Sequence, residues 1–396
     1  MTTKLKIPKI RFKEFSSEWE EKEFGNFVNK EKGKYNPKTS SENLTCIELE
    51  SIEQNTGGLL NTFDSKKQES IKNIFKQGNV LYSKLRPYLN KYYYAKFDGV
   101  CSSEIWVLNG LKTDNNFLYY IIQTSKFSKV ANISFGSKMP RSDWDFVSGT
   151  PFGIPSLPEQ QKIASFLSSV DEKIEKIKEK KKNLEEYKKG VMQKIFSQEM
   201  RFKDENGDEF GEWGEKKLGE IFDIKAGNSK SSYIDENGKN IIVDMGAIGS
   251  NYNLIGNKKT NHFEDLLTIN DLVMAKDDIG GGNIVGKVVL INKNNKYILG
   301  DHVYKLTLKN GIIKFLYYSI NSYKINKSFR QKANGTAQIG ITNGTVLNQI
   351  IPFPTLKEQE KIADFLSGID EKIEKVNDEL EKLEDFKKGL LQGMFV

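Results

Sequence analysis

The chain has 396 residues, enough for two or three domains of ordinary size. Hydrophobic residues make up 37% of the chain and only nine residues are proline, which argues against a disordered protein. The formal net charge of +7 permits a polyanionic partner without requiring one.

The residues that build most metal sites and acid–base catalysts are scarce. Cys46 and Cys101 are the only cysteines, and His262 and His302 are the only histidines. They are too few for a disulfide framework, a thiolate zinc site or catalysis by paired histidines. His302, which follows an acidic residue, is expected to be structural. No apolar run approaches the ~20 residues of a membrane span, and the first residues lack the apolar stretch of a signal peptide. We therefore expect a cytoplasmic protein without a membrane partner.

Residues 25–157 are predicted to form a mixed α/β domain. The apolar runs at 79–85 and 103–108 predict strands, and 117–122 predicts a short helix. A small basic loop, 136–142, follows this helix.

The segment 82–91 mixes cations, aromatic residues and amides directly after the first of these strands. Arg and Asn side chains can hydrogen-bond to base edges, and Lys and Tyr can contact phosphates. For any single residue, an ordinary loop that turns at Pro87 is an equally good explanation.

A long helix is predicted over residues 158–197. Its apolar residues recur every three or four positions among Glu and Lys, the pattern of a coiled-coil seam. Pro158 suits the first turn of a helix. A helix of this length spans about 60 Å and needs a partner for its apolar stripe. The predicted seam residues are Leu167, Val170, Ile174, Ile177, Leu184 and Val191.

Residues 218–355 predict a second mixed α/β domain that differs from the first in sequence. Strands are expected at 272–275 and 284–291, and a short helix at 313–318. The polar and basic segment 330–338 lies where the first domain has its loop at 136–142.

The last segment repeats the first long helix. Residues 159–177 read EQQKIASFLSSVDEKIEKI and residues 358–376 read EQEKIADFLSGIDEKIEKV, and the offset of 199 residues holds to the C-terminus. A weaker repeat around Trp19 and Trp213 begins each unit. A period near 200 residues indicates a duplicated domain rather than a solenoid. The seam residues predicted here are Leu366, Ile369, Ile373, Val376, Leu380, Leu383 and Leu390.

The two copies of the helix carry lysines at matching seam positions. Lys188 in the first copy corresponds to Lys387 in the second, and Lys181 stands where the second copy has Leu380. Lysines at such positions either set the register of two helices or extend to the margin of the seam.

Both globular segments carry a modest excess of positive charge. Residues 30–150 contain 17 Lys and Arg against 12 Asp and Glu, and residues 220–350 contain 16 against 11. A net charge of +5 in each is compatible with phosphate contact, although an ordinary solvated surface explains it equally. The predicted nucleic-acid contacts are Tyr82, Ser83, Lys84, Arg86, Tyr88, Asn90, Lys91, Lys138 and Arg141 in the first domain, and Lys276, Asn283, Lys287, Arg330, Lys332, Thr336 and Gln338 in the second.

A glycine-rich segment in the second domain comes close to a phosphate-binding loop. Residues 281–287 read GGNIVGK, but Val288 stands where the motif needs a hydroxyl for Mg²⁺. A strand is predicted to follow, whereas a phosphate-binding loop opens a helix. An enzyme that uses this loop is therefore a minor alternative.

The chain resembles the specificity subunits of type I restriction-modification enzymes over essentially its whole length. The resemblance rests on the two Trp segments, on the sequence of residues 78–88, and on the repeated helix openings Pro155-Ser156-Leu157-Pro158-Glu159-Gln160 and Pro354-Thr355-Leu356-Lys357-Glu358-Gln359. The second domain departs from the sequence of the first at 275–278, which reads AKDD where residues 83–86 of the first read SKLR.

The resemblance implies an α+β fold with two target-recognition domains in a pseudo-two-fold tandem repeat, and two long helices as an antiparallel coiled coil between them. We expect these parts at 1–157 and 200–355 for the domains, and at 158–199 and 356–396 for the helices. Each domain would read one half of a bipartite site in double-stranded DNA, and the helices would set the spacing.

The same resemblance implies that the chemistry belongs to partner subunits. Two methyltransferase subunits would dock on the helices and use S-adenosylmethionine, and motor–endonuclease subunits would use ATP and Mg²⁺. This chain would bind no cofactor and no metal and would hold no catalytic residue. The alternative from another class is a coiled-coil scaffold protein without DNA specificity.

Overall fold

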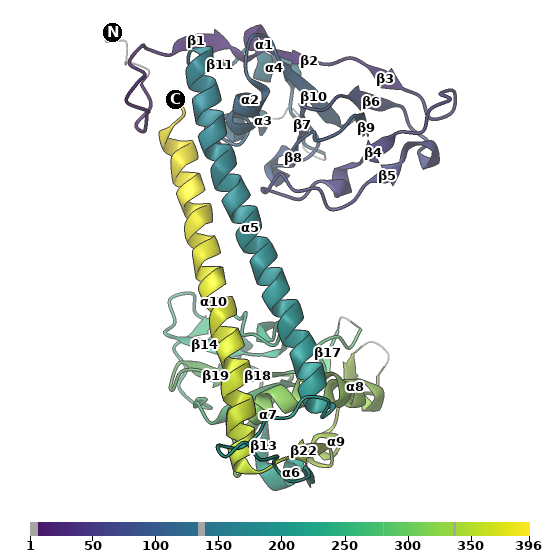
Figure 1. Ribbon diagram of the computed structural model, residues 1–396, viewed down its shortest axis with the longest axis vertical. Coiled ribbons are helices and arrows are strands. Elements are labelled where there is room, and N and C mark those ends of the chain that lie inside the picture. The colour runs from purple at the N-terminus through teal and green to yellow at the C-terminus, as the bar shows by residue number, and fades with distance from the viewer. Residues whose placement is uncertain (1–6, 134–138, 280, 336–337) are drawn as a thin grey trace. The chain divides into compact units, whose positions relative to one another are not determined.

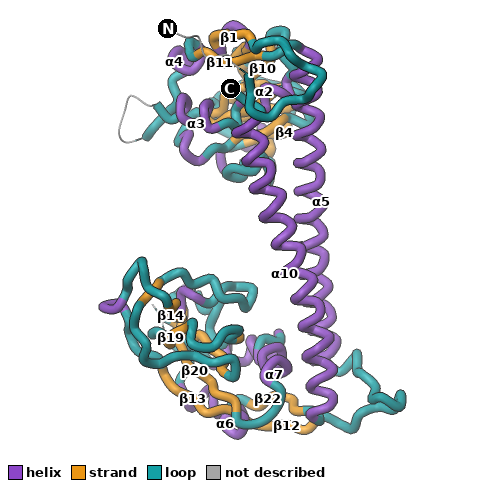
Figure 2. Tube along the Cα trace, turned by 90° about the vertical axis from the view of Figure 1, so that its left-hand side faces the viewer, coloured by secondary structure: helices purple, strands orange, loops and turns teal. Residues whose placement is uncertain are grey.

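The computed structural model describes residues 7–133, 139–279, 281–335 and 338–396 (Figure 1). The chain divides into two compact units: Met1–Lys178 with Asp378–Val396 form unit 1, and Glu179–Asn377 form unit 2. Each unit contains one globular domain and a part of both long helices, α5 (Leu157–Phe196) and α10 (Leu356–Gly393). Both helices, drawn in purple in Figure 2, begin within one residue of their predicted starts. The first ends one residue before the end of the predicted periodic segment 158–197, and the second ends three residues before 396.

The globular domain of unit 1 is built on two sheets. One is four-stranded in the order β2-β10-β7-β8, the other is five-stranded in the order β3-β6-β9-β4-β5, and β1 pairs with β11. The strands are β1 (Glu20–Glu23), β2 (Val28–Lys30), β3 (Lys34–Tyr35), β4 (Thr45–Ile47), β5 (Phe63–Asp64), β6 (Lys72–Phe75), β7 (Val80–Ser83), β8 (Tyr92–Tyr94), β9 (Gly99–Cys101), β10 (Ile105–Gly110) and β11 (Pro151–Ile154). The helices are α1 (Phe24–Phe27), α2 (Asn115–Ile121), α3 (Ser125–Ala131) and α4 (Trp144–Ser148), with 3-10 turns at Leu49–Ser51, Ser65–Lys67 and Pro87–Leu89.

The globular domain of unit 2 repeats this framework with a different second sheet. Its four-stranded sheet has the order β13-β20-β16-β18, a three-stranded sheet has the order β15-β14-β19, and β12 pairs with β22 and β17 with β21. The strands are β12 (Gly214–Lys217), β13 (Phe222–Ala226), β14 (Asn240–Val243), β15 (Lys259–Thr260), β16 (Asp271–Ala275), β17 (Asp277–Asp278), β18 (Val288–Leu290), β19 (Tyr297–Leu299), β20 (Val303–Leu308), β21 (Ile339–Gly340) and β22 (Ile350–Phe353). The helices are α6 (Leu218–Ile221), α7 (Ile313–Ile320), α8 (Tyr323–Lys332) and α9 (Asn343–Leu347), with 3-10 turns at Ser231–Tyr233 and Met245–Ala247.

One predicted strand is shorter in the structure than the sequence indicated. The sequence predicted a strand over 284–291, but the strand β18 begins at Val288. The chain turns at Gly286, where φ is 75° and a Cβ would stand 2.6 Å from the Phe329 Cβ and 2.7 Å from its ring. Glycine is needed at this position because a positive φ strains other residues and because a Cβ would clash with Phe329.

The repeated opening of the long helices has a structural explanation in both units. In unit 1, Glu159 at the start of α5 accepts hydrogen bonds from Arg11 (2.7 Å, Nε to Oε1) and from the Trp19 indole (3.2 Å). In unit 2, Glu358 pairs with Arg201 (3.0 Å). Each glutamate side chain is nearly fully buried and is paired with its arginine, as a buried carboxylate requires.

The glutamine that follows each glutamate ties its long helix to the globular domain. Gln160 accepts a hydrogen bond from the Asp114 backbone N–H (3.0 Å), just before α2, and donates one to the Pro155 carbonyl (2.9 Å). Gln359 makes the same two bonds, to Ile312 just before α7 (3.0 Å) and to Pro354 (2.9 Å). The repeated Glu-Gln pair is thus the joint between helix and domain.

Eight of the predicted seam residues are buried and the other five are half-buried. Within unit 1, α5 and α10 run antiparallel, because Asp171 contacts Lys387 and Lys178 contacts Glu384. The buried seam residues are Leu167, Val170, Ile174, Val191, Leu366, Ile369, Val376 and Leu390. Those only half-buried are Ile177, Leu184, Ile373, Leu380 and Leu383.

Replacing Leu366 by Ala should lower the free energy of unfolding by about 3 kcal/mol, because this side chain is fully buried in the unit 2 core. Leu184→Ala is the matched control, since the half-buried Leu184 loses fewer contacts and should cost about 1 kcal/mol or less. Denaturant unfolding followed by circular dichroism measures both values. Equal losses would contradict the difference in burial between these two leucines.

Among the residues that the structure describes, no helix is both long enough and apolar enough to span a membrane.

Candidate nucleic-acid interface

Two loops predicted separately in the first domain form one surface. The segments 84–91 and 139–142 are joined by a backbone bridge between Leu85 and Arg141. The Arg86 N–H donates to the Pro140 carbonyl (2.8 Å). Lys138 and the rest of 134–138, which the prediction placed in this surface, lie outside the described residues.

Arg86 and Tyr88 are exposed on this surface. Arg86 has a left-handed backbone (φ 50°, ψ 60°) and its side chain is exposed, as is Tyr88 at 55%. Arg86 takes part in none of the ion pairs found between described residues. A non-glycine residue held at positive φ is strained, and such strain often accompanies function.

The two other cations here share one carboxylate. Arg141 Nε lies 3.0 Å from Glu104 Oε2, and Lys84 Nζ lies 4.0 Å from the same oxygen. All three side chains are at least a quarter exposed, so the pairs are weak and a phosphate can compete for the cations.

Four of the predicted contacts in this domain are occupied inside it. Tyr82 and Ser83 are 1% and 2% exposed because β7 is an inner strand with both faces covered, so neither reaches a ligand. Asn90 bonds to Asn55 (3.1 Å), and Lys91 Nζ donates to the Leu49 carbonyl (2.6 Å). Tyr82 and Ser83 are therefore too buried to make the predicted contacts, whereas Asn90 and Lys91 are half-buried and stay predictions.

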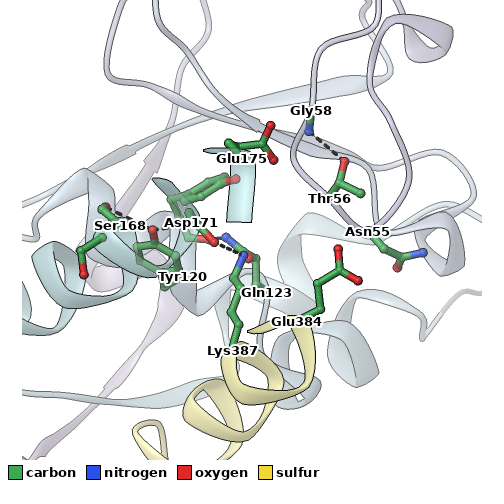
Figure 3. Close-up of polar contacts among 12 residues, drawn as sticks. Asn55, Thr56, Gly58, Tyr120, Gln123, Ser168, Asp171, Glu175, Glu384 and Lys387 are labelled. Carbon is green, nitrogen blue, oxygen red and sulfur yellow. Dashed lines mark hydrogen bonds and ion pairs between the residues drawn. The ribbon is translucent and has the colours of Figure 1, made fainter. Parts of the chain in front are cut away.

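The sequence prediction missed the loop 53–58, which contacts the segment 84–91 through Asn90. Figure 3 shows Asn55, Thr56 and Gly58 of this loop. The Asn55 N–H donates to the Asn90 carbonyl (3.1 Å), and the Tyr92 hydroxyl donates to the Asn55 carbonyl (2.8 Å). Thr56 accepts from the Gly58 N–H (3.0 Å). Residues 53–56 are exposed, and their amide and hydroxyl groups suit contact with base edges. The signal was the run Asn55-Thr56-Gly57-Gly58, a turn sequence.

Unit 2 has an equivalent loop, 249–254, at the corresponding place in its framework. Its Tyr252 has φ of 64°, as Asn55 has φ of 62° in unit 1. Lys287 donates to the Ser250 carbonyl (2.9 Å), and its Nζ lies 5.1 Å from the centre of the Tyr252 ring. Burial and the nearby Arg330 charge lower the pKa of Lys287 from its ordinary value. Lys287, Tyr252 and Arg330 thus form a cationic and aromatic surface. We name 53–58 and 249–254 the reader loops.

The remaining predicted contacts of unit 2 differ in exposure. Asn283 and Lys332 are exposed and Lys276 is half-buried, and Lys332 also donates to the buried Gln349 (2.9 Å). Thr336 lies outside the described residues.

His302, which was expected to be structural, contacts other residues of its own domain. It has φ of 58° and a side chain 43% exposed. Its Nδ1 lies 2.9 Å from Asp277 Oδ1 and 3.0 Å from the predicted contact Gln338.

The glycine-rich segment of unit 2 does not have the geometry of a phosphate-binding loop. Gly281 and Gly282 have positive φ, and the chain enters strand β18 at Val288 rather than a helix. Across the described ranges, no three His, Cys, Asp or Glu side chains are grouped as metal ligands.

Comparison with known proteins gives a consistent picture. A family model described as the type I restriction modification DNA specificity domain matches residues 16–186 and 211–385. The type I restriction enzyme MjaVIII specificity subunit of Methanocaldococcus jannaschii is 30% identical over 294 residues, covering 70% of this chain and 68% of that protein. The EcoDI specificity subunit of Escherichia coli is 38% identical over 95 residues, 24% of this chain and 21% of that protein.

Two solved structures share the fold. The type I restriction-modification S subunit from M. genitalium superposes with a TM-score of 0.60 at 18% identity, covering 98% of this chain and 99% of that one. A chain from a study of complex assembly and conformational transition in the type I R-M system superposes with a TM-score of 0.57 at 18% identity, covering 94% of this chain and 96% of that one.

Proposed function

The chain belongs to the family of type I restriction-modification DNA specificity domains, and we propose that it reads a bipartite DNA site, one half with each globular domain. The observation that carries this proposal is the repetition of one surface in two different chemical forms. Both domains place a reader loop with a positive-φ residue beside cations, but the first presents Asn55 and Arg86 and the second presents Tyr252, Lys287 and Arg330. Equal frameworks with unequal side chains suit the reading of two different half-sites.

We propose that the helix pair sets the spacing between the half-sites and provides the docking surface for two methyltransferase subunits. The chain itself then acts as a non-catalytic subunit without a cofactor. S-adenosylmethionine would be bound by the methyltransferase subunits, and ATP and Mg²⁺ by motor–endonuclease subunits joined through the complex. Since the partner is cellular DNA, the cytoplasm is the proposed location.

The proposal is tested by methylome sequencing of cells that produce this chain together with its methyltransferase subunit. A bipartite motif with methylated adenine in each half, present only with this chain, is the expected result. Cells with the methyltransferase alone are the control. An unchanged methylome from a soluble, assembled complex would favour the scaffold alternative.

Arg86→Ala and Arg330→Ala should each weaken recognition of a different half-site. Each arginine is exposed on one of the two surfaces, and a lost arginine–base contact costs about 1–3 kcal/mol of discrimination. Binding to oligonucleotides with one half-site randomised at a time measures the effect, and each variant serves as the control for the other. Loss of discrimination at both half-sites from either change would mean that the domains do not read independently.

A further inference from the structure

In unit 1, an aspartate on α5 joins the globular domain to the second long helix (Figure 3). The Tyr120 hydroxyl on α2 donates to Asp171 Oδ2 (2.9 Å) and lies 3.1 Å from Ser168 Oγ. The other oxygen, Asp171 Oδ1, pairs with Lys387 Nζ of α10 (2.8 Å). One carboxylate therefore connects three elements.

Unit 2 contains the same arrangement with the roles of the long helices exchanged. The Tyr318 hydroxyl on α7 donates to Asp370 Oδ2 of α10 (2.6 Å), and Asp370 Oδ1 pairs with Lys188 Nζ of α5 (2.6 Å). Lys188 Nζ also lies 5.2 Å from the centre of the Tyr318 ring, and Lys387 lies 5.9 Å from that of Tyr120. Each long helix thus gives its aspartate to one triad and its lysine to the other.

These contacts differ from ordinary surface ion pairs. The side chains of Lys387 and Lys188 are only 15% and 16% exposed and occupy seam positions, where leucine would pack better. Nearby burial and the aspartate charge raise the pKa of both tyrosines, so their hydroxyls remain protonated donors. A partly buried charged pair at a seam is costly, and its best-attested role is to specify geometry.

In each unit, the residue that directly precedes the triad tyrosine contacts the reader loop. Tyr119 precedes Tyr120, and its hydroxyl packs against the backbone of Gly57, where a Cβ would lie only 2.1 Å from it. Tyr317 precedes Tyr318 and donates to the Tyr252 carbonyl (3.1 Å). In each unit, one helical turn of the globular domain contacts the reader loop and the long helices together.

We propose that Tyr120–Asp171–Lys387 and Tyr318–Asp370–Lys188 are positioning triads that fix the orientation of each reader loop on the long helices, and so determine how strictly the half-site spacing is read. This inference rests on the proposed function. The triads carry no base contact, so they act on the spacing and not on the half-site sequences.

The test uses the full chain with its methyltransferase partner and compares Lys387→Met and Lys188→Met with wild type. Methionine keeps the length and apolar stem of lysine and removes its charge. Lys388→Met and Lys189→Met are matched controls, because these neighbouring lysines are exposed. Methylation is measured on DNA in which both half-sites are kept and the spacer is one base pair longer or shorter than preferred.

Each triad variant should lose about tenfold in preference for the correct spacer, the size expected for a lost hydrogen bond to a charged group. The controls should keep the wild-type preference, and Lys387→Arg should restore it. An unchanged preference in folded Lys387→Met and Lys188→Met protein would overturn the inference and leave the triads as stabilising contacts. If a methionine variant does not fold, Tyr120→Phe or Tyr318→Phe decides by the same measurement. A wild-type chain without any bipartite motif would instead refute the proposed function.

Discussion

Deleting one heptad from both long helices, residues 176–182 and 375–381, should shorten the spacer between the half-sites by about three base pairs. Seven helical residues rise about 10.5 Å, and the DNA strand rises 3.4 Å per base pair. Seven residues also complete nearly two helical turns. The helix segments before and after the deletion therefore keep their relative orientation about the helix axis to about 20°. Both half-site sequences should stay unchanged.

The two triads make this deletion a clean experiment. The removed residues lie between Asp171 and Lys188 on α5 and between Asp370 and Lys387 on α10, so both ion pairs survive. Deleting the heptad from α5 alone is the control, because it puts the two ion pairs out of register and should abolish assembly. Methylome sequencing reads the spacer directly. The wild-type spacer in the double deletion would exclude the helices as the element that sets it.

The duplicated architecture could be predicted from the sequence because duplication leaves a direct alignment. The offset of 199 residues placed Glu159 opposite Glu358 and Lys188 opposite Lys387, and the structure gives both pairs the same contacts. The sequence left two roles open for the seam lysines. The structure shows that Lys188 and Lys387 form ion pairs with aspartates of the other helix, which one helix alone cannot reveal.

The composition of the candidate surface was less predictable, because it depends on contacts distant in the chain. Tyr82 and Ser83 were predicted as contacts together with the polar segment after the strand, yet they lie in an inner strand. Asn55 was overlooked although it bonds to Asn90, 35 residues away. No local pattern predicts which turn packs beside which strand end.

Seam burial shows the same limit of local patterns. A heptad predicts equal burial along a helix, but Leu167 and Leu366 are fully buried while Leu184 is half-buried. The difference arises because Leu167 and Leu366 belong to the cores of the globular domains as well as to the helix seam. The full burial of these two leucines therefore reflects the domain cores as well as the heptad pattern.

The first repeat alone, residues 1–199, should form a dimer and read an inverted repeat of the first half-site. In the full chain, Leu390 of α10 and Met394, which directly follows α10, complete the core of unit 1, and Val191 and Ile195 take the matching places in the core of unit 2. These pairs are related by the offset of 199 residues. A second copy of residues 1–199 can therefore supply Val191 and Ile195 where the second repeat supplies Leu390 and Met394.

The polar contacts of such a dimer are also present within one repeat. Asp171 would pair with Lys188 of the second copy in place of Lys387, and Lys178 with Glu185 in place of Glu384, so each contact forms twice about a two-fold axis. Light scattering measures the mass, and methylome sequencing with the methyltransferase subunit reads the site. The control is Val191→Asp, which places a charge in the shared core and should prevent the dimer. A folded monomer of residues 1–199 would contradict this prediction and would mean that the two repeats share a framework but are no longer interchangeable. The full chain joins two unlike halves, so nothing requires either half to pair with a copy of itself.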